Sequence, residues 1–94
     1  MKVILHLTAR PETADKLKAV LLEVAKHSRT EKGCISYQIL QNVTDPLSFT
    51  TLEEWVSETA IDQHMAQPHT QKAFAEGVPL LAKEFDLRKF QTIG

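Results

Sequence analysis

The sequence predicts an α+β domain in which an antiparallel sheet is covered on one face by helices. Four stretches have the alternation or apolar content of strands, and two of the three segments between them show helical periodicity. Their order along the chain is β-α-β-β-α-β, which is typical of the ferredoxin-like fold. Residues 1–94 are expected to form a single domain, because a chain of this length supports only one thin core.

The first half of the chain predicts a strand, a helix and a second strand. Residues 2–9 alternate between aliphatic odd positions and mixed even positions, and the strand stops before Pro11. An amphipathic stripe then predicts a helix that is capped by Thr13 and runs to about residue 32. Gly33 is expected to end this helix in a left-handed conformation. Residues 34–42 predict the second strand.

The second half predicts two more strands and two helices. Turn residues around Pro46 separate the second strand from a third at residues 49–55. Ser57 can cap a helix over about 58–66, and Pro68 suits the first turn of another that runs to about residue 83, loosened near Gly77. The alternating residues 84–93 predict the last strand.

Composition excludes several classes of protein. The chain has 11 Lys and Arg against 12 Asp and Glu, and no basic stripe indicates binding to nucleic acid or to an anionic membrane. Its one cysteine, Cys34, cannot form an internal disulfide, which fits a reducing cytoplasm. The N-terminus lacks an apolar run long enough for a signal peptide or a membrane span. We therefore expect a cytoplasmic protein.

Residues of catalytic type gather where the third strand meets the next helix. Phe49, Thr51, Glu53 and Trp55 share one face of that strand, and His64 lies two turns into the helix. If this face lines a cavity, Glu53 is a candidate base with a raised pKa, and Trp55 is a flat wall for an aromatic ligand. His64 is then a candidate for proton transfer. The structural alternative is that Trp55 is core and its indole N–H bonds to Glu53 or to the backbone.

Two further residues are candidates for the lining of such a cavity. Tyr37 could donate a hydrogen bond to a quinone or phenol oxygen, although a half-buried strand tyrosine is common for packing alone. His6 lies on the mixed face of the first strand, where a structural role is the alternative.

No metal or cofactor site is expected. His64 and His69 are five residues apart, whereas two histidine ligands on one helix face are three or four apart. The chain has no phosphate loop, dinucleotide fingerprint or nucleophile elbow.

Two blocks of residues together resemble the antibiotic biosynthesis monooxygenase family of small dimeric α/β-barrel proteins. The matching positions are Glu31, Gly33, Cys34 and Tyr37 in the first block, and Phe49, Glu53, Trp55, His64, Pro68, His69 and Phe74 in the second. The resemblance covers essentially the whole chain. It implies a homodimer whose sheets face each other, and a ligand cavity that lies either between each sheet and its helices or where the two sheets meet. A homodimer is also expected because a strand with two apolar faces needs two covers.

The resemblance implies a monooxygenase that oxidises a small quinol-like or phenolic aromatic with dioxygen and carries no cofactor. Polyketide oxygenases of this type often have an asparagine on the third strand where this chain has Thr50 and Thr51, which favours the quinol-type reaction. Two alternatives remain open. One is an isomerase acting on a small phosphorylated carbonyl compound, for which Arg88 or Lys89 would bind the phosphate. The other is a non-catalytic module for small-molecule binding or stress response.

Overall fold

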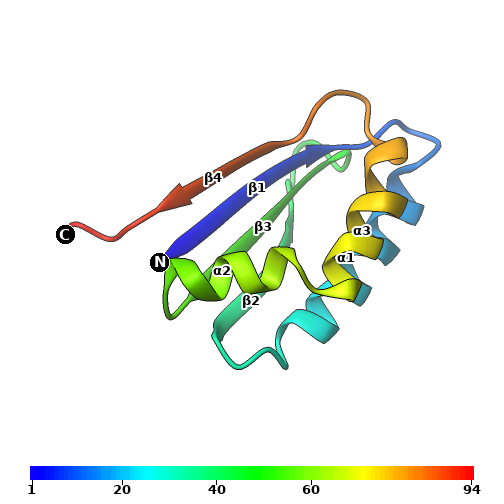
Figure 1. The fold of residues 1–94 in the computed structure, drawn as a ribbon. Helices are drawn as coiled ribbons and strands as arrows, with labels where there is room; N and C mark the ends of the chain where they lie inside the picture. The colour runs from blue at the N-terminus through cyan, green and yellow to red at the C-terminus, as the bar shows by residue number, and fades with distance from the viewer.

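The computed structural model describes residues 1–94 and confirms the predicted ferredoxin-like order of elements (Figure 1). Four strands form one antiparallel sheet in the spatial order β2-β3-β1-β4. The strands are β1 (Lys2–Thr8), β2 (Cys34–Gln41), β3 (Ser48–Trp55) and β4 (Asp86–Phe90). The helices are α1 (Ala14–Ser28), α2 (Glu58–Met65) and α3 (Pro68–Gly77), followed by a short 3₁₀ helix, Val78–Leu80. All helices lie on one side of the sheet (Figure 1).

The core lies between the sheet and the helices, as the strand patterns predict. Along β3 the side chains alternate between buried and half-buried, so every second residue points towards the helices. One apolar cluster gathers around Leu17 of α1 and Phe49, and a second gathers around Trp55 and Ile61 of α2. The aliphatic face of β1 and the face of β3 that carries Phe49 and Trp55 are therefore the two faces that point towards the helices.

The connection from α1 to β2 differs from the expectation. The helix ends at Ser28, whose hydroxyl donates to the Val24 carbonyl at 2.6 Å, and residues 29–33 form turns. Gly33 is not left-handed, because no glycine has a positive φ. Glycine is needed there for another reason: an added Cβ would overlap the Cβ of Ala60 on α2. The loop and α2 therefore approach each other closely.

The start of α2 and the end of α3 agree with the sequence prediction, whereas the end of β4 does not. Ser57 caps α2 as predicted, because its side chain accepts from the backbone N–H of Ala60 at 3.1 Å. The break after Gly77 is also confirmed. The last strand is shorter than residues 84–93, because Phe90 already pairs with Lys2 at the start of β1 and no neighbouring strand continues beyond it.

The outer face of the sheet carries no helix. Its side chains are mixed, and four of them are large apolar groups: Ile4, Leu40, Leu52 and Phe90. Leu40 and Phe90 are both 45% exposed in the single chain. None of the helices combines the length and the apolar character that crossing a membrane requires.

Candidate active site

A cavity of about 210 Å³ lies between the inner face of the sheet and the three helices. Most of its lining is aliphatic or aromatic, including Leu5, Leu21, Val24, Ile61, Phe74 and Leu87. Its polar side chains are Tyr37, Thr51, Glu53, His64, Thr70 and Lys89. An apolar cavity with a few convergent polar groups is the usual form of a small-molecule site.

Glu53 is held at the wall of this cavity by its own strand neighbours. The Thr51 hydroxyl donates to Glu53 Oε2 at 2.7 Å, and the Trp55 indole N–H donates to Oε1 at 3.0 Å. The side chain is 4% exposed and has no Lys or Arg ion-pair partner. Burial raises the pKa of the Glu53 carboxyl, which the two hydrogen bonds only partly oppose. Glu53 is therefore suited to hold a proton and donate it.

His64 reaches the same wall from α2. Its Nε2 lies 3.9 Å from Glu53 Oε1, which is too long for a direct hydrogen bond. Its ring packs on the Trp55 indole with centroids 4.5 Å apart. The predicted convergence of Glu53 and His64 is thus seen in the structure, and Trp55 packs against both groups.

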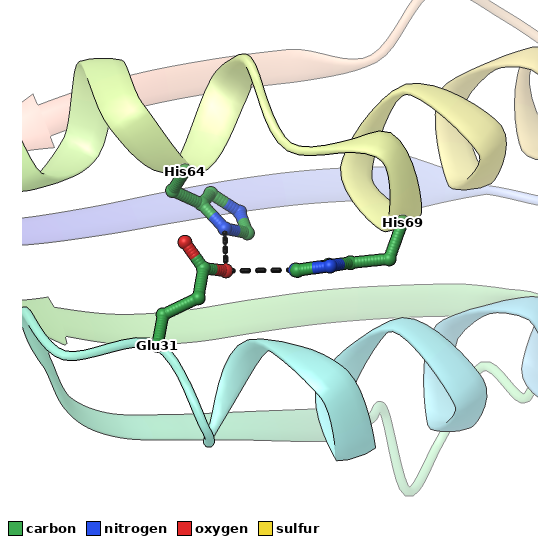
Figure 2. Close-up of side chains that lie close together, drawn as sticks. All are labelled: Glu31, His64 and His69. Carbon is green, nitrogen blue, oxygen red and sulfur yellow. Dashed lines mark hydrogen bonds and ion pairs between the residues drawn. The ribbon is translucent and has the colours of Figure 1, made fainter.

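On its other side His64 is bound to Glu31, which comes from the loop after α1 (Figure 2). His64 Nδ1 lies 2.7 Å from Glu31 Oε2, and His69 Nε2 lies 2.8 Å from the same oxygen. A carboxylate oxygen only accepts hydrogen bonds, so each of these nitrogens carries a proton when Glu31 is ionised. The proton on Nδ1 leaves Nε2 of a neutral His64 as the basic atom, on the side facing Glu53.

Tyr37 and Thr51 also lie where the sequence analysis expects them. Both line the cavity from the inner face of the sheet. Burial, and secondarily the nearby Glu53 carboxylate, raises the pKa of the Tyr37 hydroxyl well above its ordinary value. This hydroxyl therefore stays protonated and is available as a hydrogen-bond donor.

Three other expected site residues do not line the cavity. Phe49 and Trp55 are fully buried behind its wall. Trp55 is a core residue, as the structural alternative states, and its indole N–H donates a hydrogen bond to Glu53. His6 points to the outer face of the sheet, where its Nδ1 lies 2.8 Å from Thr50 Oγ1. Alternation along β1 places His6 opposite the aliphatic residues that face the helices.

Glu31 is the site residue that sequence reasoning missed. Its place in the first family block indicates no role for its side chain. It lies 33 residues before His64 in sequence, so no local pattern links the two. The break of the helices between His64 and His69 turns both imidazoles towards this carboxylate, which a spacing rule for one helix does not anticipate.

Glu53 should make the free energy of unfolding fall as pH rises. Its folded-state pKa is raised, so the stabilisation from its proton is complete below the unfolded pKa of about 4.3 and is lost as pH rises through the folded pKa. Wild type should therefore lose stability relative to Glu53→Gln as pH rises above the unfolded pKa. Urea denaturation at a series of pH values measures the difference. Glu54→Gln, on the outer face, is the matched control, and a pH-independent difference for Glu53→Gln would contradict the raised pKa.

Comparison with known proteins identifies the family. The sequence profile described as "Antibiotic biosynthesis monooxygenase" matches residues 1–76. YcnE of Bacillus subtilis, named provisionally as a monooxygenase, is 28% identical over 82 residues, which are 87% of this chain and 86% of YcnE. Rv0793 of Mycobacterium tuberculosis, named in the same way, is 31% identical over 67 residues, which are 71% of this chain and 65% of that protein. The chain spans 58% of an uncharacterized Synechocystis relative that is 27% identical to it.

Solved structures agree with this assignment. The structure of Rv0793 matches with a TM-score of 0.94 at 25% identity and covers 99% of this chain and 94% of that chain. A crystal structure described as an antibiotic biosynthesis monooxygenase also gives a TM-score of 0.94, at 24% identity, and covers 99% and 98% of the two chains. That second likeness shows the shared fold alone. Because the family profile spans most of the sequence, the chain belongs to the antibiotic biosynthesis monooxygenase family.

Proposed function

We propose that this chain is a cofactor-independent monooxygenase that oxidises a small quinol-like or phenolic aromatic with dioxygen. The observation that carries the proposal is the meeting of an imidazole and a buried carboxyl, His64 and Glu53, at one wall of an apolar cavity. Membership of the family and the names of its relatives support oxygenation as the class of reaction.

The proposed reaction balances without an external reductant. A quinol and dioxygen give a hydroxyquinone and water, so the substrate supplies all four electrons that dioxygen accepts. One oxygen atom forms a new bond to a ring carbon, and the other leaves as water. The step that the protein must promote is removal of a phenolic proton, since the resulting anion reduces dioxygen far more readily than the neutral phenol.

Each polar group has a role in this scheme. His64 Nε2 takes the phenolic proton, and Glu31 stabilises the imidazolium through the Nδ1 contact. The Tyr37 hydroxyl and a protonated Glu53 donate hydrogen bonds to the developing peroxide, and the apolar walls keep water from competing for them. Trp55 and Thr51 hold the Glu53 carboxyl in place.

The size of the cavity restricts the substrate. Its volume of about 210 Å³ is below the roughly 300–1,000 Å³ that is usual for drug-sized ligands. We therefore favour aromatics of one or two rings. The test is oxygen uptake by chelator-treated protein with a series of such quinols, followed by mass spectrometry of the product formed under ¹⁸O₂. One labelled atom per product supports the proposal, while binding of quinols without turnover favours the non-catalytic module.

The position of Lys89 is consistent with the isomerase alternative. Lys89 lines the cavity, whereas Arg88 lies on the outer face beside Asp86. Lys89 Nζ is 3.5 Å from Glu58 Oε1 and is therefore partly neutralised. A phosphorylated carbonyl substrate would have to displace this contact. Loss of such a compound in the absence of oxygen would favour the isomerase over the monooxygenase.

We also propose that the protein is a homodimer joined through the outer face of the sheet. The helices leave that face uncovered. Burying the face against a second copy would stabilise a domain whose own core is thin. Phe90 of β4 lies on this face, whereas Phe85, just before β4, packs against Phe74 of α3.

Phe90→Glu should weaken the dimer, because it places a charge in the apolar part of the proposed interface. Sedimentation velocity at micromolar concentration should show a shift from dimer to monomer. Val43→Glu is the matched control, since Val43 is 97% exposed in the turn after β2. A wild-type protein that sediments as a folded monomer would refute the dimer.

A further inference from the structure

Glu31, His64 and His69 bring three metal-ligating atoms together behind the cavity wall (Figure 2). They come from three separate segments: the loop after α1, the last turn of α2 and the first turn of α3. Their ligand atoms all lie within 4.8 Å of one another. We propose that these three residues bind a divalent transition-metal ion such as Zn²⁺, and that this ion inhibits the proposed reaction.

The spacing of the three ligand atoms suits a common ion. Donors that each lie about 2.1 Å from one Zn²⁺ are roughly 3.0–3.4 Å from one another. Glu31 Oε2 is 2.7 Å from His64 Nδ1 and 2.8 Å from His69 Nε2, and all three ligand atoms lie within 4.8 Å of one another. An outward shift of the carboxylate, together with an adjustment of the two imidazoles, would admit the ion. Two imidazoles and one carboxylate also form a donor set that Zn²⁺ and Co²⁺ accept.

The surroundings of His64 resemble the outer shell of known metal sites. A metal-bound histidine usually directs its other ring nitrogen towards a carboxylate or a carbonyl. Here His64 Nε2 faces Glu53 Oε1 at 3.9 Å, and a small movement would close this distance to a hydrogen bond. Glu31 forms no ion pair with Lys or Arg, and its side chain is only 10% exposed, so a bound cation would balance its carboxylate charge.

The site can be reached from solvent on the side of His69. A depression of about 70 Å³, separate from the main cavity, is lined by Glu23, His27, His69 and Lys72 among others. The His69 ring is stacked on His27, with centroids 5.8 Å apart, and is 22% exposed. The depression therefore brings solvent to the His69 side of the proposed site, and water can supply the remaining coordination positions of an ion bound there.

The ion would inhibit the reaction because it binds the Nδ1 atom of His64. This part of the inference rests on the proposed function. The ion takes the lone pair of Nδ1 only after the ring has changed tautomer: Nδ1 releases its proton to solvent, and Nε2 takes up one proton from solvent. Neutral His64 then carries its only ring proton on Nε2, so it can no longer accept a proton from a substrate in the cavity. Metal binding and general-base catalysis by His64 are therefore mutually exclusive.

The competing explanation is that Glu31 simply accepts one hydrogen bond from each imidazole. His69→Gln separates the two explanations, because a glutamine amide can still donate to Glu31 from about the position of Nε2 but is a poor ligand for Zn²⁺. His6→Gln is the matched control, since His6 is exposed on the opposite face of the sheet.

The experiment titrates chelator-treated protein with Co²⁺, read from its visible absorption, and with Zn²⁺ in competition with a chromophoric chelator. We expect one ion per chain, affinity lowered at least roughly 100-fold in His69→Gln, and unchanged affinity in His6→Gln. Circular dichroism checks that both variants are folded. Absence of saturable binding, or equal affinity in wild type and His69→Gln, would overturn the metal site.

Turnover provides an independent readout. Zn²⁺ should inhibit quinol oxidation by wild type at one equivalent, and His69→Gln, compared with its own metal-free rate, should resist this inhibition. Stoichiometric Zn²⁺ that leaves the rate unchanged would overturn the inhibitory role but not the site. If no quinol is oxidised, the proposed function fails while the Co²⁺ titration still decides whether the metal site exists.

Discussion

His64→Asn should lower kcat for a quinol substrate by roughly 10²-fold or more, which is the contribution typical of a positioned general base. The asparagine amide can still donate to Glu31 from about the position of Nδ1, so the loop and α2 should keep their contact. What disappears is the basic Nε2 atom facing the cavity. Steady-state oxygen uptake, measured on metal-free protein, gives the rate.

The matched control for this substitution is His6→Asn, which removes an imidazole from the exposed outer face and should leave the rate close to that of wild type. Unfolding curves should show that His64→Asn remains folded. A His64→Asn enzyme that retains more than about a third of the wild-type kcat would mean that another group, or water, takes the proton.

Trp55→Ala should destabilise the fold by about 3–5 kcal/mol, the cost usual for truncating a large buried aromatic side chain. Trp55 has no exposed surface, packs on the His64 ring and belongs to the second apolar cluster. Its loss also removes the indole N–H that donates to Glu53 Oε1. Urea denaturation followed by circular dichroism, at one fixed protein concentration, measures the change.

Two further variants serve as comparisons for Trp55→Ala. Val56→Ala, next in sequence but 65% exposed, should change the free energy of unfolding by less than about 0.5 kcal/mol. Trp55→Phe keeps much of the ring volume without the N–H donor, so it should cost less than Trp55→Ala. A loss below about 1 kcal/mol in Trp55→Ala would contradict a packing role for this residue.

The fold could be predicted from the sequence because its signals are local. Alternation along residues 49–55, the apolar stripe of α1 and the caps around Ser57 each depend on neighbours only a few residues away. The ends of elements were less predictable where they depend on distant partners. Thus β4 stops at Phe90 because β1 begins at Lys2, and the loop residue Gly33 must be a glycine because Ala60 of α2 lies so close to it.

Some residues of the candidate site could likewise be predicted from local sequence, and others could not. Glu53 and His64 could be placed together because β3 leads almost directly into α2. Glu31 could not be assigned a role, since its position under the two histidines depends on where α1 ends and on how closely the loop packs against α2. Nor could alternation alone decide that Tyr37 lines the cavity while Phe49 and Trp55 lie behind its wall, because that depends on how the helices pack.

The protonation of the His64 ring is the property on which the proposed proton transfer depends most directly. Nitrogen-15 NMR of chelator-treated protein distinguishes a protonated from an unprotonated ring nitrogen in the neutral imidazole. Because Nδ1 lies 2.7 Å from Glu31 Oε2, we predict that the proton is on Nδ1 and that Nε2, on the side of Glu53, is unprotonated. A neutral His64 with its proton on Nε2 would contradict this account, since no basic atom would then face the cavity.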